Sequence, residues 1–202
     1  MGARFRWSGL IALVALMLAP LQAATVSRQN AETFAKKLVQ IRQQGGSTQK
    51  AAPALRRTPV SEDELNSWFT YSGQSYIPPG VSQPQLTLVG NGKVSGTATV
   101  DLEAIGKRRS TGGTFDPWSY LGGRVPVTVE GILHTQNGRG RFEVQSAEVS
   151  GLPVPKAVLQ ELVSYYSRTD QNPAGINLDA QFPLPAGIRQ IELGQGQAVV
   201  IQ

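Results

Sequence analysis

Alternation of apolar and polar residues dominates the middle of the chain and predicts antiparallel strands. Between residues 86 and 102, apolar residues fall at every second position on either side of a Gly90-Asn91-Gly92 break. Glycine and asparagine tolerate the positive φ angles that tight hairpin turns require. This segment is therefore predicted to be a half-buried β-hairpin with one apolar face.

A second alternating pair, residues 125–133 and 141–149, flanks an Asn137-Gly138 turn signal. The phase of the alternation slips by one residue in the return strand, which predicts a β-bulge near Gln145-Ser146 and a bent sheet. Residues 188–202 alternate in the same way around a glycine-rich turn. The sequence thus predicts three hairpins, the third of which follows a helical segment.

Two segments of the same region have the three-to-four-residue period of an amphipathic helix. The first begins at Ser61, which forms a capping-box signature with Glu64, and it ends near Gly73. The second follows Pro155 and carries a broad apolar stripe as far as Tyr166. This order of elements predicts an α+β fold, in which a curved antiparallel sheet of hairpins is wrapped on one or two amphipathic helices.

A further amphipathic helix is predicted at residues 24–44, where a narrow apolar stripe is followed by two glycines. Residues 45–59 are predicted to be a flexible linker, because they offer little that can be buried. The helix is therefore expected to be a detached element beside an α+β domain of residues 60–202. The favoured interpretation is a surface helix that rests on the domain, and the alternative is a basic element that docks on a membrane or a partner.

The first 23 residues have the pattern of a secretory signal peptide. Arg4 and Arg6 precede an apolar run from Leu10 to Leu18, and small residues around Ala23 suit a signal peptidase. The run is about half of the roughly 20 residues that a spanning helix needs. We therefore expect an exported protein, periplasmic or extracellular, with an uncleaved membrane anchor as the alternative.

Composition excludes several classes of site and partner. The chain has no cysteine and one histidine, so thiolate-based zinc or iron–sulfur sites and histidine-rich metal sites are excluded, and no cofactor is expected. Of 19 basic residues, cleavage after Ala23 removes Arg4 and Arg6, which leaves 17 against 14 acidic residues, a net charge of +3. That charge is too small to indicate nucleic acid, although it permits a mild attraction to anionic lipid.

No group of residues forms a convincing catalytic centre. His134 falls beside a turn, and no Gly-x-Ser-x-Gly nucleophile elbow occurs in the chain. Asp101 and Glu103 lie on the polar side of a predicted strand, where solvation explains them. The sequence therefore predicts a protein that is not an enzyme.

The segment of residues 106–123 combines basic and aromatic residues. Such a mixture suits a membrane surface, because the rings sit at headgroup depth while the cations pair with phosphate. The alternative is a long surface loop whose rings cover one end of the core. The predicted headgroup contacts are Lys107, Arg108, Arg109, Phe115, Trp118 and Tyr120.

Three short pieces carry a resemblance to a known family: the helix at Glu64–Phe69, the Leu152–Pro155 entry to the second helix, and the ending Phe182–Ile188. Together with the valine-rich strands, they resemble the small bacterial members of the tubular lipid-binding (TULIP, BPI-like) superfamily over roughly residues 60–202. The resemblance implies a helix lying against a strongly curved sheet, with acyl chains in the apolar groove between them. It also implies lipid binding, lipid transfer or envelope maintenance without catalysis.

The resemblance transfers no binding residue by motif, and the chain departs from it in the basic-aromatic segment and the N-terminal helix. The apolar stripes of the two domain helices are the predicted ligand wall, with ordinary core as the alternative. A scaffold protein of the envelope, docking a partner protein through the N-terminal helix or residues 106–123, is the alternative function, and a hydrolase of envelope polymers is a third. The predicted wall comprises Trp68, Phe69, Val158, Leu159, Leu162, Val163 and Tyr166.

Overall fold

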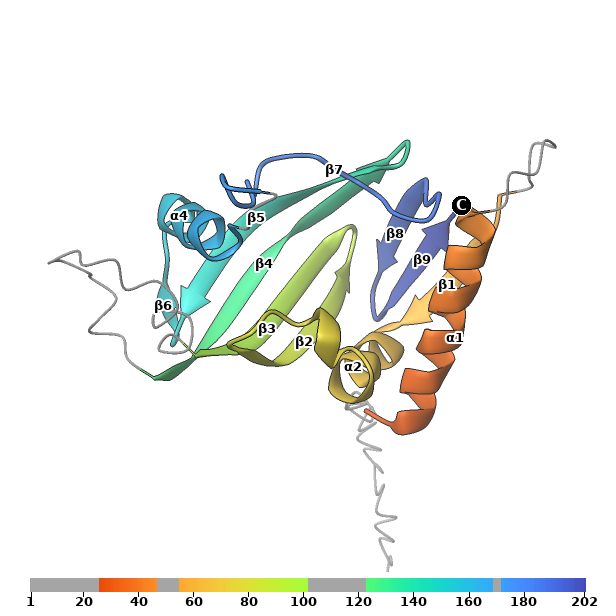
Figure 1. Cartoon of the computed structure of the whole chain (residues 1–202), viewed down its shortest axis with the longest axis horizontal. Coiled ribbons are helices and arrows are strands. Elements are labelled where there is room, and N and C mark those ends of the chain that lie inside the picture. Colours follow the sequence, from red (N-terminus) through yellow and green to blue (C-terminus); the bar gives the residue numbers. More distant parts are fainter. Residues whose placement is uncertain (1–25, 47–54, 102–122, 169–171) are drawn as a thin grey trace, which may run out of the picture.

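The computed structural model describes residues 26–46, 55–101, 123–168 and 172–202. The predicted signal peptide and most of the predicted basic-aromatic segment lie outside these ranges. Within them the chain is α+β, as predicted, and its strands form two antiparallel sheets (Figure 1). The helices are α1 (Arg28–Gly45), α2 (Glu62–Tyr71), α4 (Lys156–Tyr166) and the short 3-10 helix η1 (Gln74–Tyr76).

The larger sheet has six strands in the order β2-β3-β4-β5-β6, with β7 pairing beside β5. Its two long hairpins, β2–β3 and β4–β5, are the first two hairpins that the alternation predicts. Two short pieces of extended chain pair with β5 at that edge of the sheet. The strands are β2 (Val81–Gly90), β3 (Lys93–Asp101), β4 (Arg124–Gln136), β5 (Arg139–Val149), β6 (Leu152–Pro153) and β7 (Phe182–Pro183).

The smaller sheet has the order β1-β9-β8. The third predicted hairpin, β8–β9, is confirmed, but it pairs with β1 instead of extending the larger sheet. Three of the residues of β1 were assigned to the flexible linker, and that boundary is wrong. Arg57, Thr58 and Pro59 fit into β1 because it is an edge strand, which pairs on one side only. The strands are β1 (Arg57–Ser61), β8 (Gln190–Gly194) and β9 (Gln197–Ile201).

The β-bulge predicted in the second hairpin is present. Glu130 pairs with Ser146, and the next residue of β4, Gly131, pairs with Val144. Gln145 is therefore the extra residue, and the shift lets Phe142 and Val144 point to the same side as Ala147. A Cβ on Gly131 would lie 2.5 Å from the ring of Phe142, so the glycine leaves room for that ring.

Register places the apolar residues of four strands on one side of the larger sheet. Ala98 pairs with Val127, for example, and Val129 lies between Gly96 on β3 and Ala147 on β5. The opposite side carries mainly threonine, serine and charged residues. We call the first side the apolar face; it comprises Leu86, Leu88, Val94, Gly96, Ala98, Val100, Val125, Val127, Val129, Gly131, Leu133, Phe142, Val144, Ala147 and Val149.

The N-terminal helix is not detached, which corrects the expectation from the sequence. The ring centroid of Phe34 lies 5.6 Å from that of Trp68 on α2, and the Lys37 ammonium lies 2.7 Å from the Glu64 carboxylate. Ala31 and Phe34 are buried. The apolar stripe of α1 is narrow, but α2 offers an aromatic ring to Phe34 and a carboxylate to Lys37.

The far end of α1 contributes to the core of the smaller sheet. Ile41 is buried with Ile188 and Val200, and Leu184 and Ile191 pack against them. The Gln202 carboxamide donates to the Ile41 carbonyl at 2.9 Å, which ties the end of the chain to the helix. These contacts make α1 part of the domain.

Helix α2 begins with the predicted capping box and covers the free edge of β2. Ser61 and Glu64 exchange the two hydrogen bonds of that motif. The carboxamide of Asn66 accepts from the Leu86 N–H and donates to the Leu86 carbonyl, both at 2.8 Å, as a neighbouring strand would. Glu62 accepts from the Leu88 N–H at 2.6 Å. An exposed edge that invites pairing with other chains is thereby closed.

Replacing Asn66 with alanine is expected to lower the free energy of unfolding by about 1–3 kcal/mol. The backbone N–H and carbonyl of Leu86 would lose the hydrogen-bond partner that the buried Asn66 provides. Urea unfolding measures the change. Gln40→Ala, which truncates an exposed carboxamide on α1, is the control and should stay within about 0.5 kcal/mol of wild type. Equal stability of both variants would show that the edge contact contributes nothing.

Candidate functional site

The two helices of the predicted ligand wall lie at opposite ends of the larger sheet. Helix α2 runs beside β2, whereas α4 packs on β5 (Figure 1). The structure therefore does not bring Trp68 and Phe69 together with the α4 residues. Periodicity indicates an apolar stripe on each helix but carries no information about which strand each stripe meets.

Trp68 packs at the junction of α1, α2 and η1. Its ring centroid lies 5.5 Å from Phe69 and 5.2 Å from Tyr76, in addition to the contact with Phe34. A Cβ on Gly73 would come within 2.6 Å of the same ring. These neighbours surround the ring, so Trp68 holds α1 and α2 together.

Phe69 lines a cavity of about 900 Å³ at the start of β2. Ile77, Val81 and four prolines are among its other apolar lining residues. Glutamine and threonine side chains from β2 and β3 are among the polar ones. Phe69 is the predicted wall residue that lines this cavity.

Helix α4 keeps the other described residues of the predicted wall together. Leu159 is buried, and Val158, Leu162 and Val163 are half-buried. The polar side of the helix is fastened by the chain that follows it, because Gln160 bonds to the backbone of Ile176 and Leu178. The side chain of Tyr166 lies outside the described residues. The apolar side of α4 is thus left for the larger sheet.

The apolar face between the two helices is only partly covered by the described residues. Leu88, Val125 and Ala147 are buried, but the valines of the central strands, among them Val94 and Val129, remain half-buried. A close-packed core would bury such residues fully. A row of β-branched side chains that still meets solvent is a surface on which an apolar ligand can bind.

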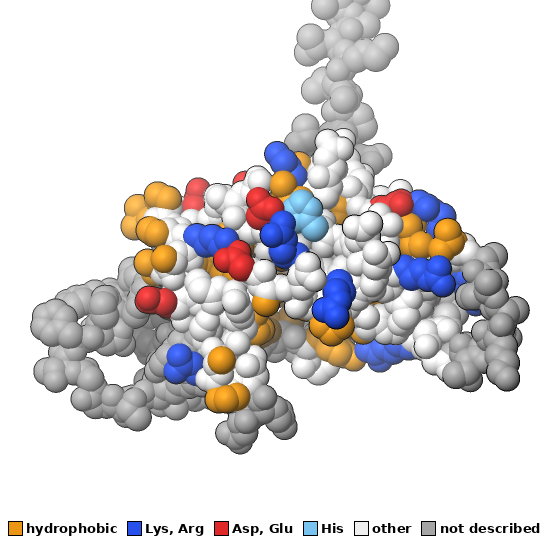
Figure 2. All heavy atoms as spheres, turned by 90° about the horizontal axis from the view of Figure 1, so that it is seen from above, with side chains coloured by type: hydrophobic (Ala, Val, Ile, Leu, Met, Phe, Trp, Pro, Cys, Tyr) orange, Lys and Arg blue, Asp and Glu red, His pale blue; other side chains and the backbone are white. Residues whose placement is uncertain are grey.

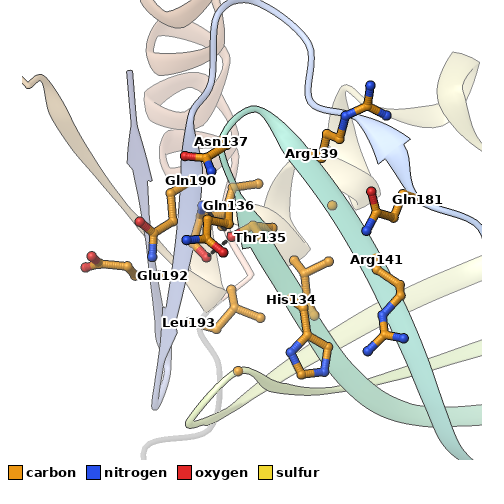
Figure 3. Close-up of a pocket in the computed structure, with 14 residues that line it drawn as sticks. His134, Thr135, Gln136, Asn137, Arg139, Arg141, Gln181, Gln190, Glu192 and Leu193 are labelled. Carbon is orange, nitrogen blue, oxygen red and sulfur yellow. Dashed lines mark hydrogen bonds between the residues drawn. The ribbon is translucent and has the colours of Figure 1, made fainter.

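A second cavity, of about 770 Å³, lies where the end of the β4–β5 hairpin approaches β8 (Figure 3). We call it the hairpin pocket. Gln190, Glu192 and Leu193 come from β8 on one side, and His134 and Arg141 come from the hairpin on the other. Its remaining lining residues include Gly92, Leu133, Thr135, Gln136, Asn137, Arg139, Gly140, Gln181 and Ile191.

Several polar contacts fix the shape of the hairpin pocket. The Thr135 hydroxyl donates to the Ile191 carbonyl at 2.8 Å and accepts from its N–H at 2.9 Å, which joins the two sheets. Glu143 lies 3.2 Å from His134 Nε2 and 3.4 Å from the Arg141 guanidinium. Figure 2 shows the single histidine at this surface beside acidic and basic side chains.

The hairpin pocket was not foreseen from the sequence. Arg139 and Arg141 are two residues apart in the sequence. Gln181, Gln190 and Leu193, however, lie some forty or more residues further along the chain. Only the contact between the two sheets brings the groups together. The predicted headgroup residues of 107–120 lie outside the described part of the chain, so the structure does not place them.

Among the described residues, no group of three or more histidine, cysteine, aspartate or glutamate side chains is arranged to hold a metal ion. None of the described helices combines the length and the apolar character needed to cross a membrane. Comparison of the chain with protein-family models, with curated proteins and with solved structures gives no match.

Proposed function

We propose that this protein is an exported, non-enzymatic protein that binds the acyl chains of lipids on the apolar face of its larger sheet. The observation that carries the proposal is the half-buried state of that face between α2 and α4. The signal-peptide pattern of residues 1–23 supports export. The resemblance to the tubular lipid-binding superfamily supports the choice of an acyl chain as the ligand.

Burial of hydrocarbon supplies the binding energy. Each methylene group removed from water contributes about 0.8 kcal/mol, so a chain that covers several valines gains enough to outweigh the loss of its own freedom. The small residues Gly96, Ala98 and Ala147 lie in the middle of the face, beside Val129. Small side chains there give an acyl chain closer access to the sheet.

Helix α4 is the second wall of the proposed site. It places Val158, Leu162 and Val163, all half-buried, near β5. Its following segment holds it through Gln160 and through Ser164, whose hydroxyl donates to the Ile176 carbonyl at 3.1 Å. A wall fastened on its polar side can keep its apolar side open to a ligand without separating from the sheet.

The alternative role as an envelope scaffold protein has less support at α1. The apolar stripe of that helix is used inside the domain, where Ala31, Phe34 and Ile41 are buried. A partner would meet its outer side, on which Val39 stands among charged residues and glutamines. That surface is ordinary for a solvated helix.

Titration of the purified protein with a fluorescent long-chain fatty acid tests the proposal. We expect saturable uptake with a blue shift of the emission, because the fluorophore enters an apolar site. The same fluorophore without an acyl chain is the control and should not bind. A linear, unsaturable signal with the fatty acid would contradict the proposed function.

A further inference from the structure

We infer that the ligand is an anionic amphiphile whose carboxylate or phosphate binds in the hairpin pocket near Arg139 and Arg141, while its acyl chain lies along the apolar face. This inference rests on the proposed function and adds to it the class of ligand and the direction in which the ligand lies.

The hairpin pocket lies at the end of the apolar face. Leu133 belongs to that face, and Thr135 and Gly140, which pair with each other, are the next positions on the same side. His134 with Arg141 and Gln136 with Arg139 form the neighbouring pairs, and all four residues lie on the opposite side of the sheet. Since residues of both sides line the pocket, it opens around the end of the hairpin, where the apolar face stops.

The pocket has a surplus of positive charge. Glu192 pairs with Arg57, and Glu143 lies within 3.4 Å of Arg141. Arg139 lines the pocket (Figure 3) and has no carboxylate partner in the part of the chain that the structure describes. A guanidinium presents paired N–H donors that match the oxygens of a carboxylate or a phosphate.

Neutral donors complete the surroundings of an anion. Gln181 and Gln190 line the pocket, and within the described residues neither side chain makes a hydrogen bond. Arg141 is held in place by Glu143, so it is oriented before a ligand arrives. An oxyanion near Arg139 would meet a guanidinium group, and the carboxamides of Gln190 on β8 and of Gln181, just before β7, line the same pocket.

An apolar side chain lies beside the pocket, at the end of the apolar face. The ring of Phe182 lies over Gly140, where a Cβ would come within 2.6 Å of it, and Phe182 is 40% exposed. Leu184 lies next to it over the same glycine. An acyl chain that leaves the pocket would therefore touch hydrocarbon at once.

The dimensions agree with a single long acyl chain. Gly140, on the same side as the apolar face, and Ala147 are seven residues apart on β5, and one of the intervening residues is the bulge residue Gln145, which leaves roughly 20 Å at the rise of a strand. A bilayer core of about 30 Å holds two leaflets, so one acyl chain reaches roughly 15 Å. A chain that starts at the hairpin pocket thus extends most of the way to Ala147.

The test compares a long-chain fatty acid with its methyl ester, which has the same chain and no charge. Each competes against the fluorescent fatty acid on wild type and on Arg139→Gln. We expect wild type to prefer the acid by about tenfold at low salt, and we expect this preference to shrink as salt is added. Arg139→Gln should lose the preference while it still binds the ester as wild type does.

Arg189→Gln is the matched control, because Arg189 is exposed nearby and does not line the pocket. It should keep the preference. Equal affinity of wild type for acid and ester, or an unchanged preference in Arg139→Gln, would overturn the inference while leaving the proposed function intact. Failure of both acid and ester to bind would instead overturn the proposed function.

Inorganic phosphate distinguishes a lipid headgroup from a free anion. The inference expects phosphate alone to compete only weakly, because it lacks the acyl chain. If phosphate displaces the fatty acid as well as a second fatty acid does, the pocket binds free anions and the ligand class proposed here is wrong.

Discussion

Replacing Phe34 with alanine is expected to lower the free energy of unfolding by about 3–5 kcal/mol, the usual cost of removing a large buried ring. Phe34 is 7% exposed and meets the edge of Trp68. Its loss leaves a void between α1 and α2 and also weakens the support of Trp68, against which Phe69 and Tyr76 pack. The variant should therefore affect both helices.

Chemical denaturation measures the stability of Phe34→Ala, and limited proteolysis shows where the chain opens. We expect faster cleavage within α1 in this variant. Val39→Ala on the same helix is the control; Val39 is 52% exposed, so its truncation should change stability by less than about 0.5 kcal/mol. If the two variants are equally stable, α1 rests loosely on the domain, as the expectation from the sequence had it.

The hairpins could be predicted from the sequence because their evidence is local. Period-two alternation defines the apolar side of each strand, and the Asn137-Gly138 turn fixes the register of β4 against β5. The bulge at Gln145 was visible as a slip in that alternation. The capping box of Ser61 and Glu64 could be predicted for the same reason, because its two residues are only three positions apart in the sequence.

Features that depend on distant partners were missed. Nothing near Arg57 or Pro59 indicates a strand, because the reason for that strand is β9, more than a hundred residues later. The docking of α1 depends on Glu64 and Trp68, which a helix stripe alone cannot specify. The sequence also did not reveal that the two predicted ligand walls are far apart. An apolar stripe shows that one side of a helix is buried, but it does not show which strand that side packs against.

Replacing Val129 with tryptophan is the second change with a large expected effect, and it acts on the proposed lipid site. Val129 is half-buried in the middle of the apolar face, between Gly96 and Ala147. The two small neighbours leave space above the sheet that an indole can fill. We expect fatty-acid affinity to fall by at least about tenfold, or about 1.4 kcal/mol, because the indole takes the place of the acyl chain.

Stability separates a ligand surface from an ordinary core. An indole forced into a packed core would lower the free energy of unfolding by about 1–3 kcal/mol. At an open apolar face it should cost little, so Val129→Trp should unfold close to wild type. Glu130→Trp places the same side chain on the next residue of β4, exposed on the opposite side of the sheet, and is the control for both properties.

The most direct test of lipid binding at the apolar face is therefore the fatty-acid titration of Val129→Trp beside Glu130→Trp and wild type. Our account predicts that wild type and Glu130→Trp take up the fatty acid alike, whereas Val129→Trp remains folded and loses uptake. Uptake by Val129→Trp with the affinity of wild type would show that the acyl chain binds elsewhere and would contradict the account.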